Sequence, residues 1–539
     1  MDVRVIPTAT ARRTLVAGAG ALVSLIMAAL LPLVVDAHAG FAIAGLAAVV
    51  LGVGAGMLSD RTAPTVLAPA AVAVSAVVGC SLLSTPGVYL PIVAVWAGLG
   101  VQVARRITSG GFVVRLPRLP ILVVLSLYAA VVVVTSVTAV DRGVSAQYLV
   151  TILGALGLSI FMIPAMLGGD AGRRLAIVCA SVGVTCVISS VVLVVVGPVR
   201  AFGHYLGAYT LVEPTWRGHR LGFSLPEASG FYGKPGYQSL ALAVALGALL
   251  GVRQTFPGRW RAAGAVAAAG LIVGLLVTMA RGGWLAGVAA CLAVLVGQVR
   301  RRHVDVVVIA ASGIVLLAAI AQLSGVLGAV ARYDVAAQRY GTTIAKGMIL
   351  AGNADVELVP SSGHGSKVAE STAPQVRGGS DSQSRIILWK ASLRAIGKRP
   401  LTGFGPGTDA LAIEDELSGG AVAYRGLTSH NTFLRTAVET GLVGGIAFAA
   451  FVILTMAYGA GALLRPNADA NQDWRATTAL VSVLSALAVA QLTETLLLGG
   501  VTFVSLVWAV ATAVAFPGPR QILVSPLRWP GPQSAARVR

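Results

Sequence analysis

One histidine stands where a long polar stretch of the chain meets an apolar one, within Ser429-His430-Asn431-Thr432. A serine side chain can accept hydrogen bonds from the first free backbone N–H groups of a helix. Ser429 is therefore predicted to be an N-cap, and His430 to open the helix that follows. An imidazole at the water edge of such a helix can exchange protons near neutral pH and reach a polar substrate. The same position also suits an interfacial histidine without a chemical role.

A second candidate is Arg281, which interrupts two apolar runs together with Gly282 and Gly283. An arginine at membrane depth costs about 2.5–3.5 kcal/mol on insertion scales, and less near the interface. The two glycines carry no side chains, so a ligand or another backbone can approach closely. A guanidinium there suits bidentate binding of phosphate oxygens. The alternative is a structural arginine at a hairpin tip that extends toward water.

Cations and aromatic residues gather in the segment 199–235. The cationic candidates are Arg217, Arg220 and Lys234, with Trp216, Phe231 and Tyr232 nearby. This mixture suits a sugar-phosphate ligand, although a solvated loop can have the same composition.

Two carboxylates follow the histidine in apolar segments. Glu439 is four residues after Arg435, so the two can pair on one helix face, where Glu439 would neutralise the arginine. Glu439 would lie about 14 Å along the helix axis from His430. Glu494, near the end of the next apolar segment, is a further candidate for a residue that supports the histidine, as is Asn431.

The composition of the chain indicates the elements that must position these residues. Of its 539 residues, 56% are hydrophobic and 11% are charged, and many apolar runs reach the ~20 residues of a bilayer-spanning helix. The predicted fold is all-α: a polytopic membrane helix bundle of about 12–14 transmembrane helices, with a large outer loop that contains short helices. The four cysteines lie in apolar runs with neither disulfide nor metal-ligand spacing.

Apolar and polar stretches divide the chain into five parts. These are N-terminal transmembrane helices at 1–198, an outer loop and central transmembrane helices with the Arg281 hairpin at 199–324, a large extracytoplasmic loop at 325–429, C-terminal transmembrane helices at 430–516 and a tail at 517–539. Arginine and lysine concentrate on one side, in connections such as 105–119 and 300–303. This predicts that both termini are cytoplasmic, and that 199–235 and 325–429 lie outside. The net charge of +19 does not indicate nucleic-acid binding, because the basic residues are scattered at helix ends.

The second outer segment contains one helical pattern. Ile386, Trp389, Leu393 and Ile396 recur at helical spacing. They predict an amphipathic helix at 383–397 that lies on the membrane surface or over a cleft. Asp381 and Ser382 are its predicted caps, and the stretch from Pro400 to Gly407 ends it. The preceding residues 351–384 are rich in small polar residues and are predicted to form a mobile loop.

Three blocks of this sequence resemble, in order, those of the O-antigen ligase and polymerase family of membrane glycosyltransferases. They are 278–287, 385–407 (RIILWKASLRAIGKRPLTGFGPG) and 429–445 (SHNTFLRTAVETGLVGG). The resemblance implies a fold of the lipid-sugar glycosyltransferase type, with His430 as the catalytic histidine and Arg281 as a diphosphate-binding arginine. The family's further arginine maps best to Arg220, with Arg217 and Lys234 as substitutes, because Glu227 stands near its usual place.

The resemblance also implies the reaction. It is transfer of a glycan from a polyprenyl diphosphate to an acceptor hydroxyl on the outer face of the cytoplasmic membrane, in cell-surface polysaccharide assembly. No metal or cofactor is expected, because arginines can offset the charge of the leaving diphosphate. The expected partners are the lipid-linked donor, a glycan or envelope acceptor, and the lipid bilayer, with no nucleic acid.

Two alternatives remain open. One is a transporter or flippase of lipid-linked glycan, which the scarcity of charges in the cytoplasmic half of the spans disfavours. The other is a polyprenyl-monophosphate-dependent glycosyltransferase. Such enzymes often carry an acidic motif in the first outer loop, where this chain has only Asp36 and His38.

Overall fold

The structure is a computed structural model. It describes residues 112–149, 160, 171–196, 199–201, 204–206, 210–212, 215–216, 219–220, 225–227, 235–278, 280–320, 376–377, 381–417, 428–464, 474–494, 503–515 and 517–524. The spans predicted before residue 112 lie outside these residues, as do Arg217, Lys234 and most of 321–380.

The described residues are almost entirely helical, which confirms the predicted all-α membrane fold. Five helices among them are long and apolar enough to cross a membrane. They are α5 (Leu119–Val137), α9 (Pro235–Val252), α10 (Gly258–Val277), α11 (Arg281–Arg300) and α16 (Thr432–Leu464). The other labelled α-helices are α6 (Arg142–Leu149), α8 (Ala171–Val196), α14 (Asp381–Lys398), α15 (Asp409–Leu417), α17 (Trp474–Ala490) and α18 (Phe503–Ala515).

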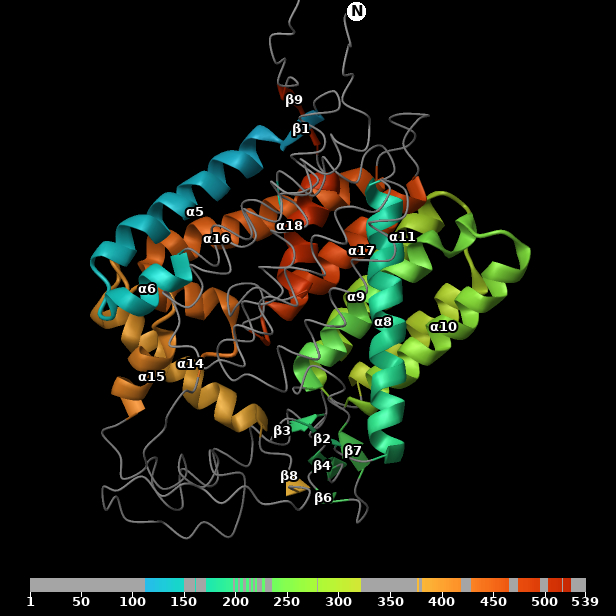
Figure 1. Cartoon of the computed structure of the whole chain (residues 1–539), viewed down its shortest axis with the longest axis horizontal. Coiled ribbons are helices and arrows are strands. Elements are labelled where there is room, and N and C mark those ends of the chain that lie inside the picture. Colours follow the sequence, from blue (N-terminus) through green and yellow to red (C-terminus); the bar gives the residue numbers. More distant parts are fainter. Residues whose placement is uncertain are drawn as a thin grey trace, which may run out of the picture.

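The centre of the bundle is formed where α9, α11 and α17 pack against one another (Figure 1). Small residues allow this close packing. In a membrane, lipid provides no hydrophobic driving force for helix association, so helices depend on close contacts between small residues. A Cβ on Gly251 of α9 would lie only 2.6 Å from the Cα of Ala479 in α17. A Cβ on Gly247 would lie 2.9 Å from the Cβ of Ala290 in α11. The helix ends that carry the candidate residues are therefore held by a tight core.

Short strands occur at two ends of the molecule (Figure 1). At the top of Figure 1, β1 (Phe112–Pro117) pairs antiparallel with β9 (Pro517–Val524). These strands come from a connection and a tail that the charge distribution assigns to the same side. At the bottom lie β2 (Val199–Ala201), β3 (His204–Leu206), β4 (Thr210–Val212), β5 (Thr215–Trp216), β6 (His219–Arg220), β7 (Leu225–Glu227) and β8 (Val376–Arg377). The parallel pairing of β4 with β8 brings the two predicted outer segments together.

Helix α16 is interrupted, unlike the helix that the sequence predicted to begin at His430. Gly441 has φ 71° and ψ −178°, so the helix is broken there and resumes at Leu442. The stretch 400–407 docks on the break through three backbone hydrogen bonds. They run from Phe404 N–H to Val438 O (2.9 Å), from Gly405 N–H to Glu439 O (2.8 Å) and from Leu442 N–H to Pro400 O (2.7 Å). Backbone groups that the break frees are thereby paired inside the protein, as the interior of a membrane requires.

Glycine is required on both sides of this contact. Gly403 has φ 62°, and a Cβ there would collide with the Glu439 carbonyl oxygen. A Cβ on Gly441 would collide with the Leu401 carbonyl oxygen in the same way. The glycines therefore allow two backbones to touch directly. The turn between α5 and α6 secures the loop from its other side, since Val140 N–H donates to Phe404 O at 2.9 Å.

Helix α14 exists as predicted, but its buried face only partly matches the predicted one. Ile396 of the predicted apolar face is buried, and Ile386 and Trp389 are half-buried, whereas Leu393 is 58% exposed. The other buried residues are Ile387, Leu388, Ala391 and Ala395. The helix contains two adjacent apolar stripes, and periodicity alone does not choose between them. The small side chains of Ala391 and Ala395 decide the choice, because they allow close packing against α15 and α16. The predicted capping residues Asp381 and Ser382 belong to its first turn.

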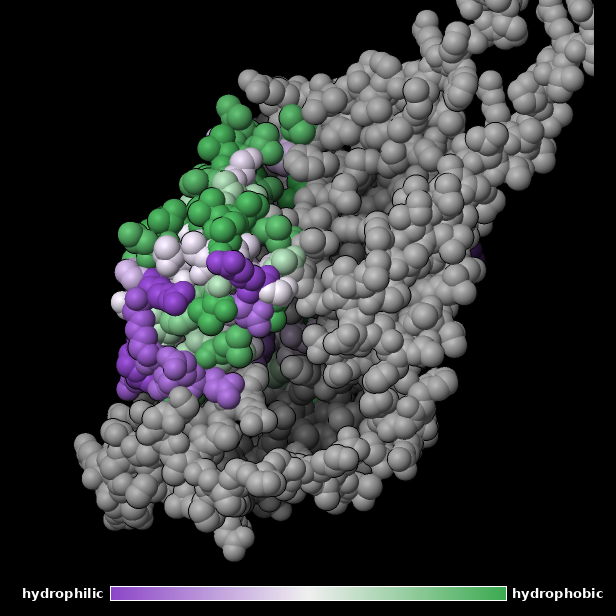
Figure 2. Space-filling view, turned by 60° about the vertical axis from the view of Figure 1, so that its left-hand side comes forward, coloured by the Kyte–Doolittle hydropathy of each residue, from purple (hydrophilic) through white to green (hydrophobic). Residues whose placement is uncertain are grey.

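One face of the molecule combines an apolar upper part with a hydrophilic band below it (Figure 2). The exposed apolar side chains include Val123, Val134 and Val137 of α5 and Ile446 and Ile453 of α16. Charged pairs between α14 and α15 include Arg394–Glu416 at 3.1 Å and Lys398–Glu416 at 2.6 Å. Hydrogen bonds to Glu416 and Asp415 raise the pKa of Lys398. The α14–α15 pair thus carries a charged surface, whereas α5 and α16 expose apolar surface.

Candidate functional site

His430 precedes helix α16 and does not open it, because the first helical residue is Thr432. The N-cap is Asn431, whose Oδ1 accepts the Leu434 N–H at 3.0 Å, so the prediction of Ser429 as N-cap is wrong. His430 instead has φ 48°, in the left-handed region that residues other than glycine rarely adopt. Its backbone is therefore held by its neighbours in a strained conformation.

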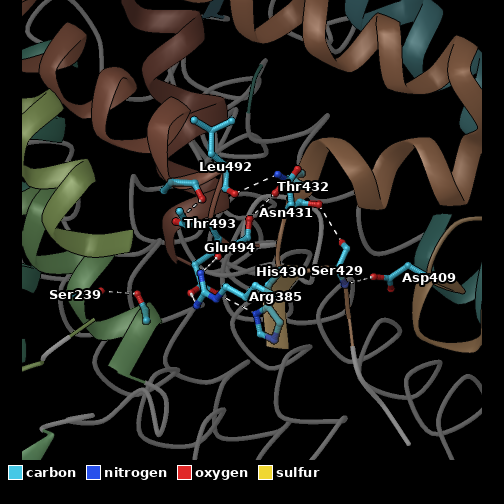
Figure 3. A network of polar contacts seen from close by, with 12 residues as sticks. Ser239, Arg385, Asp409, Ser429, His430, Asn431, Thr432, Leu492, Thr493 and Glu494 are labelled. Carbon is cyan, nitrogen blue, oxygen red and sulfur yellow. Dashed lines mark hydrogen bonds and ion pairs between the residues drawn. The ribbon is translucent and has the colours of Figure 1, made fainter. Parts of the chain in front are cut away.

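Ser429, on one side of the histidine, is held by three contacts, of which those with Asp409 and Asn431 can be followed in Figure 3. Its carbonyl oxygen accepts the Trp389 Nε1–H of α14 at 2.9 Å. Its backbone N–H points to Asp409 Oδ2 of α15 at 3.4 Å. Its hydroxyl donates to the Asn431 carbonyl oxygen at 3.0 Å, which closes the turn across His430.

On the other side, the start of α16 is attached to the end of α17. The Asn431 amide donates to the Leu492 carbonyl oxygen at 3.1 Å. The Thr432 backbone N–H donates to the Gln491 carbonyl oxygen at 2.9 Å, and its hydroxyl lies 2.8 Å from the Glu494 carbonyl oxygen. These contacts bring residues about sixty positions apart in the chain to one place, beside the histidine.

The contact that matters most for chemistry joins His430, Glu494 and Arg385 (Figure 3). His430 Nδ1 lies 3.4 Å from Glu494 Oε2. The other oxygen of Glu494 accepts from Arg385 Nη2 at 3.0 Å, and Arg385 Nη1 donates to the Thr493 carbonyl oxygen at 2.6 Å. The His430 side chain is 39% exposed, whereas that of Glu494 is only 13% exposed. The accessible imidazole of His430 therefore contacts the mostly buried carboxylate of Glu494, and the guanidinium of Arg385 neutralises that carboxylate.

Two helix N-termini reach the same carboxylate. A Cβ on Gly236, in the first turn of α9, would lie 3.0 Å from Glu494 Oε1. A Cβ on Gly282, in the first turn of α11, would collide with the Thr493 hydroxyl and lie 3.8 Å from Glu494 Cγ. Arg281, the half-buried first residue of α11, precedes Gly282 directly and so begins its helix next to Thr493 and Glu494. The two glycines of this hairpin allow close approach of a protein backbone, as the sequence indicated.

Arg435 and Glu439 form the expected ion pair, at 2.7 Å, but in a separate cluster. Both side chains are buried, and Asp409 Oδ1 lies 3.6 Å from Arg435 Nε. The ring of Tyr148 packs against the guanidinium of Arg435, with its centroid 5.6 Å from the guanidinium carbon. Glu439 belongs to this cluster, in which Tyr148 of α6 and Asp409 of α15 contact Arg435 of α16 next to the helix break.

The candidates in the first outer segment are placed only in part. Arg220 lies in β6, where its backbone pairs with Thr215 of β5. Arg217 and Lys234 lie outside the described residues. Among the described residues, no group of three His, Cys, Asp or Glu side chains could hold a metal ion.

Sequence reasoning missed Arg385, Trp389 and Asp409 as residues of this site. Trp389 was predicted only to lie on the apolar face of an amphipathic helix, and Arg385 only to begin the block 385–407. Their spacing of four residues did carry a usable signal, because it places both on one side of α14. Asp409 had no comparable signal, since its contacts with Ser429 and Arg435 depend on the folded loop.

Comparison with protein families identifies the region that contains these residues. Residues 263–449 match the family model described as O-antigen ligase. This part of the chain is similar to an O-antigen ligase domain. The match includes Arg281, Arg385 and His430, whereas Arg220 and Glu494 lie outside it. The resemblance stated from the sequence is thereby confirmed. A comparison with curated proteins found no match.

Proposed function

We propose that the protein transfers a glycan from a polyprenyl diphosphate to an acceptor hydroxyl, on the outer face of the cytoplasmic membrane. The observation that carries the proposal is the His430–Glu494–Arg385 contact at the edge of the region similar to an O-antigen ligase domain, in a membrane protein. A positioned base is what an acceptor hydroxyl needs in order to become a nucleophile.

His430 is the proposed general base. With Nδ1–H donating to Glu494 Oε2, the lone pair of Nε2 is free to accept the proton of the acceptor hydroxyl. The hydroxyl oxygen then forms a bond to the anomeric carbon. The bond from that carbon to the diphosphate oxygen breaks, and its electron pair leaves with the polyprenyl diphosphate. Glu494 stabilises the imidazolium that results, and the ion pair with Arg385 holds this carboxylate in place.

Arg281 is the proposed ligand of the diphosphate. Its guanidinium stands in the first turn of α11, where the helix dipole also favours an anion. Arg220 is the second proposed arginine, with Arg217 and Lys234 as substitutes. Together these cations would offset the charge that develops on the leaving group, so the reaction is proposed to need no metal. The acceptor is a second lipid-linked glycan in a polymerase, or another envelope molecule in a ligase.

The test uses purified protein in lipid, with a polyprenyl-diphosphate glycan, a candidate acceptor and no divalent metal. Product glycan and released lipid diphosphate are measured for the wild type, His430→Ala and His303→Ala. His303 is a matched control, because it is another exposed histidine at a helix boundary, stacked on Trp474. Loss of a general base typically lowers the rate 10²–10⁴-fold. We expect this loss for His430→Ala and none for His303→Ala.

If His430→Ala keeps more than about a tenth of the wild-type rate, the histidine is not the base. If the wild type moves lipid-linked glycan across the bilayer and forms no glycosidic bond, the protein is a transporter. Activity with a monophosphate donor in place of the diphosphate would identify the other class of glycosyltransferase.

A further inference from the structure

We propose that Trp389 is a positioning residue that holds the backbone of His430 in its left-handed conformation. The inference rests on the proposed function, because it concerns how the base is held for that reaction. Trp389 contacts Ser429, and its indole N–H is the group that acts.

Trp389 acts on the peptide group between Ser429 and His430. The angle φ of His430 describes rotation about its N–Cα bond, and this rotation turns the Ser429 carbonyl relative to the rest of His430. That carbonyl oxygen accepts the Trp389 Nε1–H at 2.9 Å. Relaxing His430 from φ 48° to an ordinary negative value would swing the carbonyl away and break this hydrogen bond. The bond therefore opposes the relaxation that the histidine backbone would otherwise favour.

The same helix also holds the partner of the imidazole ring. Arg385 and Trp389 are four residues apart on α14, so both project from one side of it. Arg385 binds Glu494, which lies against His430 Nδ1, while Trp389 binds the carbonyl just before His430. One rigid helix thus sets the position of the backbone and of the carboxylate together. The direction of Nε2 toward an acceptor follows from both.

Two substitutions separate a hydrogen-bonding role of Trp389 from a packing role. Trp389→Phe keeps an aromatic ring and removes the N–H. Trp389→His is smaller, but its imidazole is a five-membered ring like the inner ring of indole, and its Nε2–H can occupy the place of the indole N–H. If Trp389 only fills space, Phe is the better replacement. If its N–H positions His430, His is the better replacement.

The measurement is kcat and KM for the lipid-linked donor in the transfer assay, per folded molecule. Trp508→Phe serves as the control, because the Trp508 N–H is buried and has no hydrogen-bond partner in the described part of the chain. Small misplacements of reacting groups can lower rates by up to about a hundredfold. We expect Trp389→Phe to lose between about tenfold and a hundredfold in kcat with donor KM unchanged. Trp389→His should recover a large part of this loss, and Trp508→Phe should match the wild type.

The inference is overturned if Trp389→Phe turns over as fast as the wild type, or at least as fast as Trp389→His. If Trp389→Phe does not fold, the comparison of Trp389→His with the wild type decides, because a hundredfold loss in that variant also contradicts a role for the N–H. A wild type that forms no glycosidic product would instead overturn the proposed function, and this inference with it.

Discussion

At the scale of single residues, the site depends on the carboxylate of Glu494, which contacts two other side chains. Glu494 meets the imidazole of His430 with one oxygen and the guanidinium of Arg385 with the other. A carboxylate in this position fixes which ring nitrogen carries the proton and stabilises the charged imidazole when it forms. The orientation of the imidazole therefore depends on a residue 64 positions along the chain.

Glu494→Gln is expected to lower kcat by more than about tenfold while leaving donor KM unchanged, because the amide cannot stabilise an imidazolium as a carboxylate does. Steady-state kinetics of the reconstituted protein measure this. Asp415→Asn is the control, since Asp415 is 64% exposed and its pair with Lys398 is a surface ion pair of small energetic value. Equal kcat of Glu494→Gln and Asp415→Asn would show that Glu494 has no role in the mechanism.

Arg281→Lys is expected to lose much of the transfer activity although it keeps the positive charge, because an ammonium cannot form two parallel hydrogen bonds to a diphosphate. Arg300→Lys changes the last residue of the same helix and should be neutral. Turnover is compared at equal membrane abundance. Near-normal turnover of Arg281→Lys would indicate a structural arginine.

At the scale of elements, the broken helix α16 and the glycine-containing loop 400–407 form one unit. The short half-helix before Gly441 packs in a small core with α14 and α15, which includes Ala395, Ala412 and Val438. The loop and the break are paired backbone to backbone, so neither can move without the other. The histidine is therefore attached to a rigid but discontinuous element.

Gly441→Ala should strongly destabilise the protein. A non-glycine residue in the left-handed region costs about 1–2 kcal/mol, and the added methyl group would also collide with the Leu401 carbonyl. In Gly461→Ala, in the same helix, the added Cβ meets nothing within 4 Å. This substitution should raise the free energy of unfolding by roughly 0.5–1 kcal/mol. Thermal unfolding in detergent gives the comparison. Equal midpoints for both variants would contradict the break.

These elements also separate what the sequence could predict from what it could not. The helices of the described part were predictable, because long apolar runs and helical spacing depend on local sequence. The N-cap at Asn431 was not, since Ser429 carries an equally suitable side chain that is used elsewhere. The break at Gly441 and the contact of His430 with Glu494 depend on segments distant in the chain, which periodicity does not describe.

At the scale of the whole molecule, the site lies at one end of the bundle. Helix α9 begins beside Glu494 and extends about 24 Å from Gly236 to Val252, which takes the chain to the opposite end. The α14–α15 pair and the strands β2 to β8 lie at the end that carries the site, away from the pairing of β1 with β9 (Figure 1). The positive-inside rule predicts that the β1–β9 end is cytoplasmic.

Cysteine labelling on intact cells checks this assignment. Gly397 in α14 and Gly258 at the start of α10 are both exposed, and a Cβ on either meets nothing within 4 Å. In a background without native cysteines, Gly397→Cys should react with an impermeant thiol reagent, and Gly258→Cys only after the membrane is opened. The reverse pattern, or equal reaction of both, would invert or refute the topology.

The broken helix also has a consequence for how the protein is made. In hydrocarbon, each backbone group without a partner costs several kcal/mol, so the break at Gly441 cannot remain in lipid unpaired. Its partners, residues 400–407, precede it in the chain and leave the ribosome first. In the proposed topology, the segment that contains residues 400–407 has to cross the membrane before α16 can reach its final form. Assembly of the histidine site is then a late step in biogenesis, which follows the insertion of the surrounding helices and requires both sides of the break to be present.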